Sequence, residues 1–172
     1  MPQLMNPQVS RFNAIVKAPF GAVGIRLNSA NTHVQELVYL PENTPQQKAD
    51  GPLAARASEQ VNAFLANPQF KFDLPLLEQG TAFQNKVWQV IAGLDAGQVL
   101  TYKQVGQLIQ CGAPRAVGGA CGANPYPLIV PCHRVVGANG IGGFAQHDDG
   151  FYIGVKRGNC LRVSLYYQRQ RA

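Results

Sequence analysis

RAVGGACGANPYPLIVPCHRVVG, residues 115–137, combines a run of small residues with an apolar stretch that leads into a cysteine and two basic side chains. The thiolate is the reactive form of cysteine, and it is favoured by nearby positive charge and partial access to solvent. His133 and Arg134 supply basic groups beside Cys132, as a reactive cysteine requires. The apolar residues before it are also typical of an inert, buried cysteine, so the segment alone leaves both interpretations open.

Upstream of this cysteine, the sequence predicts two short helices joined by a tight turn. Residues 101–110 place Val105, Leu108 and Ile109 on one face at helical spacing, and Pro114 suits the first position of the next helix. A pair of this kind is a helix-turn-helix signature, although many ordinary helical pairs look alike.

The second helix is unusual because glycine and alanine dominate residues 118–123. Glycine costs about 1 kcal/mol relative to alanine inside a helix. Close packing on another helix is one explanation. The other is that a small face lets the backbone approach something bulky, with Arg115 reaching out from the start of the helix.

The rest of the chain reads as strands, one helix, a linker and a further helix. We expect strands within residues 11–40 around a Pro-Phe-Gly turn, a loop over 41–52, a helix over 53–67, a linker over 68–80 and a helix capped by Thr81. The first helix would place Leu53, Ala57, Val61, Phe64 and Leu65 on one face. The second would face the core with Phe83, Val87, Val90, Ile91 and Leu94. The predicted domains are an α/β domain with its linker, residues 1–79, and a helix-turn-helix domain, residues 80–172.

Composition indicates a folded protein with one basic half. The 172 residues are 46% hydrophobic and 14% charged, which excludes disorder by composition. No apolar run reaches membrane-spanning length and the N-terminus lacks a secretory pattern, so we expect a cytoplasmic protein. Residues 1–79 are neutral, whereas the rest holds nine basic and three acidic side chains, the whole excess of +6. Such asymmetry fits a nucleic-acid partner, although a solvated basic surface is the alternative.

The four cysteines predict neither a zinc site nor a disulfide framework. They show no C-x-x-C pair and no histidine at zinc-finger spacing. We expect Cys111, Cys121 and Cys160 to be small buried hydrophobic residues and Cys132 to be the exception. Adjacent side chains diverge, so a direct thiol–imidazole pair between Cys132 and His133 is disfavoured and a bridging water is easier.

Residues 115–137 closely resemble the active-site segment of the O6-alkylguanine-DNA alkyltransferases, also called methylated-DNA–protein-cysteine methyltransferases. The match extends to GTAFQNKVWQVIAGLDAGQVLTYKQVGQLI (residues 80–109), which resembles that family's helix and helix-turn-helix entry, and to APFGAVGIRL and FDLPLLEQGT nearer the N-terminus. The resemblance implies an α/β (α+β) fold in which a small sheet-plus-helix domain precedes a mainly helical, winged-helix-like DNA-binding domain.

The resemblance also implies an activity, direct repair of O6-alkylguanine in double-stranded DNA, with O4-alkylthymine as a further substrate to consider. Cys132 would accept the alkyl group, His133 would act through a water as its base, and Tyr102 would donate its hydroxyl proton to the flipped base. The thioether product is a poor leaving group, so each molecule would act once, as a monomer, with no cofactor and no metal.

The remaining family roles fall on the recognition helix and the loops around it. Arg115 would fill the space left by the extruded nucleotide, and Asn124 would hold the turn between the recognition helix and the active-site segment. The other DNA-contacting residues would be Ala116, Gly118, Gly119, Ala123 and Arg134, and the alkyl pocket would include Pro131, Val136 and Phe144. Small residues suit a helix in the minor groove, which is only about 6 Å wide.

The sequence departs from the family after the active site. GGFAQHDDG replaces the usual Gly-Tyr and Gly-Gly loop, so Phe144 lacks a hydroxyl. Val163 falls near the position of the family's histidine-orienting glutamate, and we expect Asp148 or Asp149 to substitute. The turn before Arg115 is one residue shorter and lacks the usual lysine.

Three other functions remain alternatives. A non-enzymatic lesion binder would flip and flag damaged bases, but relatives of that type lack the reactive cysteine. A helix-turn-helix transcription regulator would need long polar side chains on the recognition helix, which the Gly/Ala face lacks. A cysteine hydrolase would need a distant histidine, which only His33 or His147 could supply.

Overall fold

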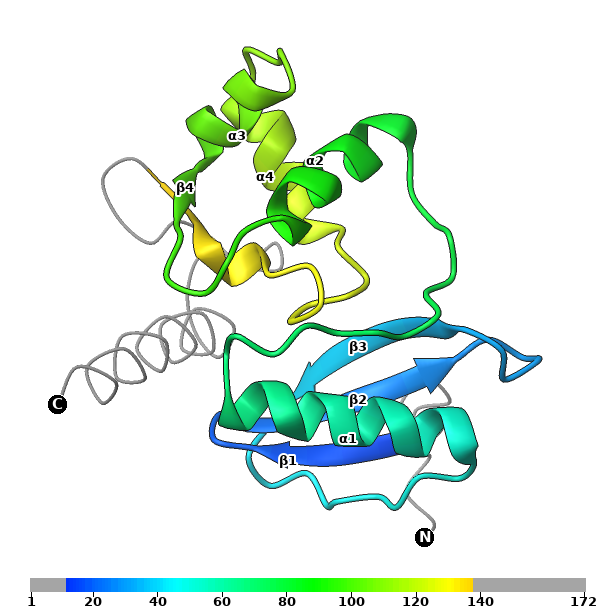
Figure 1. The fold of residues 1–172 in the computed structure, drawn as a ribbon. Helices are drawn as coiled ribbons and strands as arrows, with labels where there is room; N and C mark the ends of the chain where they lie inside the picture. Colours follow the sequence, from blue (N-terminus) through cyan, green and yellow to red (C-terminus); the bar gives the residue numbers. More distant parts are fainter. Residues whose placement is uncertain (1–11, 138–172) are drawn as a thin grey trace, which may run out of the picture.

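The computed structural model describes residues 12–137, which form a small sheet covered by one helix and, beyond a long connection, a mainly helical part (Figure 1). The strands are β1 (Ala14–Ala18), β2 (Gly21–Leu27) and β3 (Val34–Leu40), paired antiparallel in the order β1-β2-β3. This confirms the strands predicted in residues 11–40 and the predicted fold class.

The turn between β1 and β2 follows the predicted Pro-Phe-Gly sequence. Gly21 begins β2 with φ 144°, and a Cβ at this position would lie 2.2 Å from the carbonyl oxygen of Leu40. Only glycine combines that dihedral with so close an approach, so the residue fixes where the hairpin meets the end of β3.

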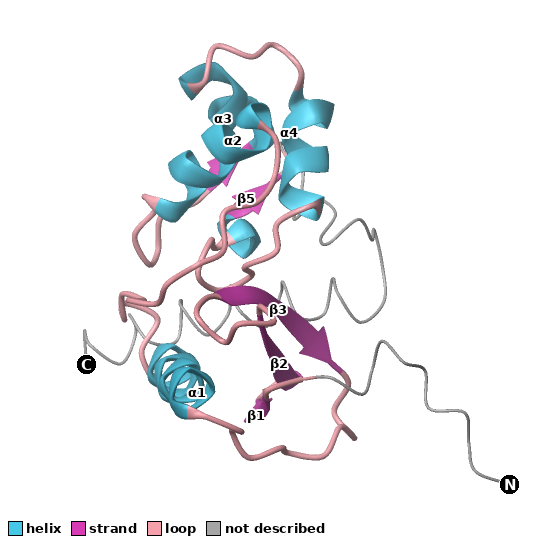
Figure 2. Cartoon of the chain, turned by 90° about the vertical axis from the view of Figure 1, so that its right-hand side faces the viewer, coloured by secondary structure: helices cyan, strands magenta, loops and turns pink. Residues whose placement is uncertain are grey.

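Helix α1 (Pro52–Ala66) packs across one face of the sheet, against β1 and β2 (Figure 2). It buries Ala54, Ala57, Val61 and Phe64. The other two residues of the predicted face, Leu53 and Leu65, are half-buried, and Leu65 packs against the core. Ala54 and Ala57 are fully buried because alanine lets the helix backbone come close to the strands.

Helix α2 (Ala82–Ala92) begins at the predicted cap. The Thr81 hydroxyl accepts from the backbone N–H of Gln84, and the Gln84 side chain accepts from the backbone N–H of Thr81. This reciprocal box satisfies two N–H groups that a helix start would otherwise leave unpaired. Trp88, which lies outside the predicted face, is buried and donates from Nε1 to the carbonyl oxygen of Ala120 at 2.8 Å.

The helix-turn-helix consists of α3 (Tyr102–Leu108) and α4 (Pro114–Gly122), as predicted, with Pro114 at the start of α4. A short parallel ladder joins β4 (Leu100–Thr101), just before α3, to β5 (Val135–Val136). The segment after Cys132 is thereby paired directly with the residues that introduce α3.

Leu108 contradicts the predicted inner face of α3. It is 64% exposed, whereas Val105 and Gly106 are buried and Ile109 is half-buried. The inward side of this short helix is taken by Val105 and Gly106, and a Cβ on Gly106 would lie 2.6 Å from the carbonyl oxygen of Cys111. The close approach of this turn to Gly106 leaves Leu108 facing outward.

One continuous apolar cluster runs from the sheet and α1 to α2, α3, α4 and the segment around Cys132. The two parts therefore share a core rather than only a linker. A domain boundary between residues 79 and 80 remains a prediction. Within residues 12–137, no helix is both long and apolar enough to cross a membrane.

Candidate active site

Cys132 starts a single turn of 3-10 helix, η1 (Cys132–Arg134), between the loop after α4 and β5. Its backbone N–H donates to the carbonyl oxygen of Val130 at 2.8 Å, and Pro131 is the buried residue that precedes the turn. The residue is 3% exposed, so the apolar surroundings that the sequence offered as one of two interpretations are present around the thiol. Cys132 belongs to the same buried apolar cluster as Leu128 and Val130.

Asn124 connects the end of α4 to this turn through both ends of its side-chain amide. Nδ2 donates to the carbonyl oxygen of Val130 at 2.8 Å and to Sγ of Cys132 at 3.2 Å. Oδ1 accepts from the backbone N–H of Tyr126 at 2.8 Å. These bonds fix the orientation of the amide, and its N–H is a donor that stabilises negative charge on sulfur.

His133 points into the interior rather than along the surface. It is 1% exposed, and its ring meets Phe64 of α1 edge-to-face, with 6.4 Å between ring centroids. The N-terminal part of the chain therefore contributes a wall to the candidate site. That Phe64 contact could not be foreseen from local sequence, because the two residues come from opposite halves of the chain.

Arg134 does not fit the predicted role of a DNA contact. Its side chain is buried, at 6% exposed, and donates from Nη1 to the carbonyl oxygen of Leu94 at 2.8 Å and from Nη2 to that of Pro68 at 3.2 Å. A guanidinium placed this way ties η1 to the segments that follow α1 and α2. The physical reason for the correction is that DNA phosphate cannot reach a group enclosed by these carbonyls.

Tyr102 occupies the first position of α3, beside the ladder that holds β5. Thr101 caps the helix with a reciprocal box to Gln104 and pairs with Val136 across the ladder. The Tyr102 side chain is half-buried against the core. The cap and the ladder together bring Tyr102 and Val136, two predicted site residues, to the same edge of the fold.

Helix α4 presents a surface of small residues. Arg115, Ala116, Gly119 and Ala123 are exposed, whereas the inward residues Val117 and Ala120 are buried. A Cβ added at Gly118 or Gly119 would meet no atom within 4 Å. Close packing on another helix is therefore not the reason for these two glycines, and their face is open.

The prediction of a buried side chain was wrong for Cys111 and Cys121, and Cys160 lies outside the described residues. Cys132 is buried, whereas Cys111 and Cys121 are half-exposed. Cys111 lies in the turn between α3 and α4, and Cys121 lies near the end of α4, so neither position is enclosed on all sides. Among residues 12–137, no group of three His, Cys, Asp or Glu side chains is placed to hold a metal ion.

Several residues from the sequence analysis lie outside the described residues. These are Phe144, His147, Asp148, Asp149, Cys160 and Val163. Their proposed contributions to the alkyl pocket and to the orientation of His133 therefore stay predictions.

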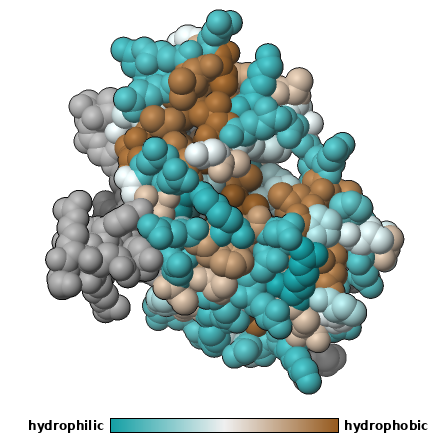
Figure 3. Space-filling view, viewed as in Figure 1, coloured by the Kyte–Doolittle hydropathy of each residue, from teal (hydrophilic) through white to brown (hydrophobic). Residues whose placement is uncertain are grey.

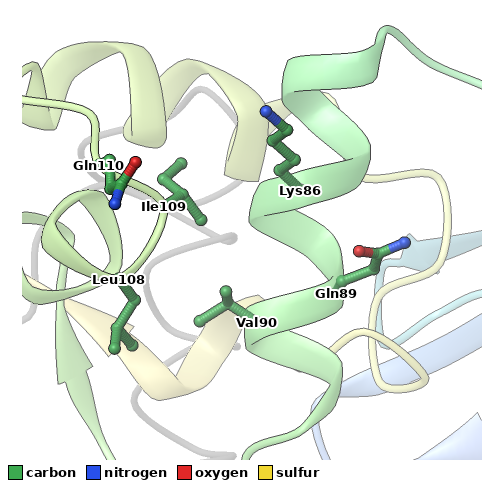
Figure 4. A pocket seen from close by; sticks show the side chains of 6 residues that line it. All are labelled: Lys86, Gln89, Val90, Leu108, Ile109 and Gln110. Carbon is green, nitrogen blue, oxygen red and sulfur yellow. The ribbon is translucent and has the colours of Figure 1, made fainter.

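An open pocket of about 430 Å³ lies between α2 and α3 (Figure 4). Its lining residues are Lys86, Gln89, Val90, Leu108, Ile109 and Gln110. Apolar surface gathers over this part of the molecule (Figure 3). No lining residue belongs to the segment 124–136, so the pocket is separate from Cys132 and we do not assign the chemistry to it.

Comparison with known proteins decides the family. Residues 82–157 match the model of the 6-O-methylguanine DNA methyltransferase DNA-binding domain. A methylated-DNA–protein-cysteine methyltransferase of Mycobacterium tuberculosis is 39% identical over 111 residues, which cover 64% of this chain and 67% of the relative. A probable one from Acanthamoeba polyphaga mimivirus is 34% identical over 131 residues, covering 76% of this chain and 85% of the relative. This chain belongs to the methylated-DNA–protein-cysteine methyltransferase family.

Solved structures of this methyltransferase family share the fold over most of the chain. Mycobacterium tuberculosis O6-methylguanine methyltransferase superposes with a TM-score of 0.70 at 30% identity, covering 89% of this chain and 93% of that one. The same organism's OGT in complex with DNA gives a TM-score of 0.71 at 29% identity, covering 87% and 91%.

Sequence reasoning missed the side-chain contact between Gln79 and Tyr126, which lies at the start of the loop that carries Cys132. Gln79 Nε2 donates to the Tyr126 hydroxyl at 2.8 Å. The only signal in the sequence was an aromatic residue between two prolines, in NPYP, directly after the predicted hinge asparagine.

Proposed function

We propose that this protein repairs O6-alkylguanine in DNA by moving the alkyl group to Cys132. Membership of the methyltransferase family supports the reaction class. The observation that carries the assignment to Cys132 is the hydrogen bond from Asn124 to its sulfur, 3.2 Å from Nδ2 to Sγ, within the turn that the family's motif predicts. A sulfur held by an N–H donor is oriented, and its negative form is stabilised before substrate arrives.

The reaction is a displacement at the alkyl carbon. His133 takes the thiol proton through a bridging water, and the Cys132 sulfur attacks the alkyl carbon as its bond to O6 of guanine breaks. Tyr102 donates its hydroxyl proton to the departing base, so guanine does not leave as an anion. The new carbon–sulfur bond is a thioether, which no group named here can cleave, so each molecule acts once and needs no cofactor.

The open face of α4 serves as the DNA-binding surface. Ala116, Gly118, Gly119 and Ala123 let the helix enter a minor groove about 6 Å wide, where contacts carry little sequence information. Arg115, exposed at the start of the helix, enters the duplex and occupies the space of the flipped nucleotide. The protein acts as a monomer in the cytoplasm, and O4-alkylthymine is a second substrate of the same chemistry.

The alkyl pocket forms beside the sulfur from Pro131 and Val136, and the third predicted pocket residue, Phe144, lies outside the described residues. Pro131 is buried beside Cys132 and Val136 is half-buried in β5, so both lie on the segment that carries the thiol.

A titration tests the function. Increasing amounts of a duplex with one O6-methylguanine are mixed with a fixed amount of protein, and the remaining lesion is counted after the reaction has stopped. We expect repair to end at one lesion per protein molecule. Repair of many lesions per molecule would contradict the single-use mechanism, and tight binding with no repair would indicate a lesion-binding protein.

A further inference from the structure

Tyr126 connects the N-terminal sheet to the loop that carries Cys132. Its buried hydroxyl lies 3.1 Å from the carbonyl oxygen of Val34 and also bonds the carbonyl of Leu77. A hydroxyl has one proton to donate, so these two carbonyls share it, while a lone pair accepts from Gln79 Nε2 at 2.8 Å.

The surrounding backbone reinforces this junction. Leu37 N–H, on β3, donates to the carbonyl oxygen of Pro125 at 2.9 Å. Leu77 N–H donates to Val34 O at 2.9 Å, and Gln79 Nε2 also donates to Gln35 O at 2.6 Å. The edge of β3, the connection around residues 75–79 and the start of the active-site loop thus form one hydrogen-bonded layer.

The backbone of Tyr126 continues this layer toward the sulfur. Its N–H donates to Asn124 Oδ1 at 2.8 Å, and its carbonyl oxygen accepts from Val130 N–H at 2.8 Å. Asn124 in turn donates to Cys132 Sγ. The path from the β3 edge to the thiol therefore passes through Tyr126 and then through the Asn124 amide.

The loop needs such an anchor because its backbone is strained. Leu128 adopts φ 75°, a left-handed conformation that is unfavourable for a residue with a Cβ, yet its side chain is fully buried in the core. Strain of this kind persists only where the surroundings over-determine the conformation. Without the Tyr126 hydroxyl, the loop has fewer contacts to oppose its relaxation.

We infer that Tyr126 is a positioning residue whose hydroxyl anchors residues 124–132 to the β3 edge and thereby holds the Asn124 amide against Cys132 Sγ. The inference rests on the proposed role of Cys132 as alkyl acceptor. It gives the N-terminal sheet a part in the chemistry, although the sheet itself carries none of the reacting groups.

The test uses the full-length protein and Tyr126→Phe, which removes one oxygen and keeps the ring. Tyr39→Phe is the matched control, because Tyr39 is also buried but lies in β3. Each change is also made in an Asn124→Ala background. Three quantities are measured: the single-turnover transfer rate with an O6-methylguanine duplex, the Kd for that duplex, and the labelling rate of the Cys132 peptide by iodoacetamide.

We expect Tyr126→Phe to slow transfer about 10- to 100-fold, in line with the cost of a misplaced reacting group, with the Kd unchanged. Tyr39→Phe should transfer at the wild-type rate. In the Asn124→Ala background, Tyr126→Phe should have no further effect on transfer or labelling, because the two residues act on the sulfur in series.

Two results would overturn the inference. One is a wild-type transfer rate for Tyr126→Phe. The other is that Tyr126→Phe slows transfer by the same factor in the Asn124→Ala background as in the wild type. If Tyr126→Phe does not fold, Gln79→Met removes one bond to the hydroxyl and should slow transfer in the same direction, and a wild-type rate would count against the inference. The iodoacetamide labelling rate of Cys132 tests the positioning role even if the proposed alkyl transfer does not occur. If the wild type transfers no alkyl group, a change in Cys132 labelling that depends on Asn124 still supports the positioning role.

Discussion

The side-chain amide of Asn124 donates a hydrogen bond to the sulfur of Cys132, with 3.2 Å between Nδ2 and Sγ. The same nitrogen donates to Val130 O, and Oδ1 accepts from Tyr126 N–H, so the amide cannot rotate without losing all three bonds. One residue at the end of α4 therefore fixes both the shape of the loop and the direction of the thiol.

Replacing Asn124 with alanine should affect both stability and chemistry. Loss of its bonds should lower the free energy of unfolding by about 1–3 kcal/mol, because Tyr126 N–H loses its acceptor and Val130 O keeps only the backbone N–H of Cys132 as a donor. Transfer of the alkyl group should also slow. Urea unfolding and single-turnover kinetics measure the two effects, with Asn62→Ala on the exposed face of α1 as the control. Wild-type kinetics in Asn124→Ala would contradict the role of the amide.

Arg134→Met should destabilise the fold without weakening DNA binding by the folded protein. The buried carbonyls of Leu94 and Pro68 lose a charged donor, which should cost about 2–4 kcal/mol in the free energy of unfolding. The slope of log affinity for duplex DNA against log salt concentration should equal that of the wild type, because no phosphate contact is removed. A shallower slope with unchanged stability would instead indicate that Arg134 contacts DNA.

Arg115→Ala should slow alkyl transfer without destabilising the fold, in contrast to Arg134→Met. Its side chain is exposed, so the free energy of unfolding should stay within about 0.5 kcal/mol of the wild type. Transfer should slow, because no side chain then fills the space of the flipped nucleotide. Lys86→Ala removes another exposed positive charge, on α2, and serves as the control. Equal transfer rates for the two variants would argue against a specific role for Arg115.

Two substitutions of Gly119 test whether α4 presents an open DNA-binding face or a face that packs against the protein. Gly119→Ala should stabilise the protein by about 0.5–1 kcal/mol, since a Cβ there meets no atom within 4 Å and alanine favours the helix. Gly119→Tyr should fold but lose affinity for duplex DNA, because the ring obstructs the minor groove. Thermal unfolding and duplex binding measure these effects. Unchanged affinity in Gly119→Tyr would place the DNA elsewhere.

Tyr126 should make the protein sensitive to alkaline pH. Burial raises the pKa of Tyr126 above its usual value near 10, so the unfolded chain releases this proton first. The stability that the raised pKa of Tyr126 contributes is complete below pH ~10, and it is lost as the pH rises through the pKa of the folded state. Tyr126→Phe should therefore flatten the fall in stability above pH ~10 in urea titrations. An identical fall in both proteins would contradict this account.

The local elements of the fold could be predicted from the sequence because their causes are local. Thr81 and Gln84 lie three residues apart, and the Pro-Phe-Gly turn and Pro114 each act within one element. The helix-turn-helix and the small face of α4 were predictable for the same reason. The resemblance to the family supplied the roles of Cys132 and Asn124, which periodicity alone could not.

Contacts between distant segments account for the errors. From its neighbours in the sequence, Arg134 is expected on the surface, but its guanidinium donates to the carbonyls of Pro68 and Leu94, 66 and 40 residues away. The Tyr126 hydroxyl bonds Val34, 92 residues earlier, so nothing near Tyr126 in the sequence indicates its role. Each of these side chains joins the sheet half to the cysteine half, and that arrangement arises only from tertiary packing.

The most direct test of the central claim is the intact mass of the protein after incubation with a duplex that carries one O6-methylguanine. The account predicts that the wild type gains the mass of one methylene group, that peptide mapping places it on Cys132, and that Cys132→Ala gains nothing. A wild-type protein that binds the duplex but gains no mass, or a gain that persists in Cys132→Ala, would contradict it.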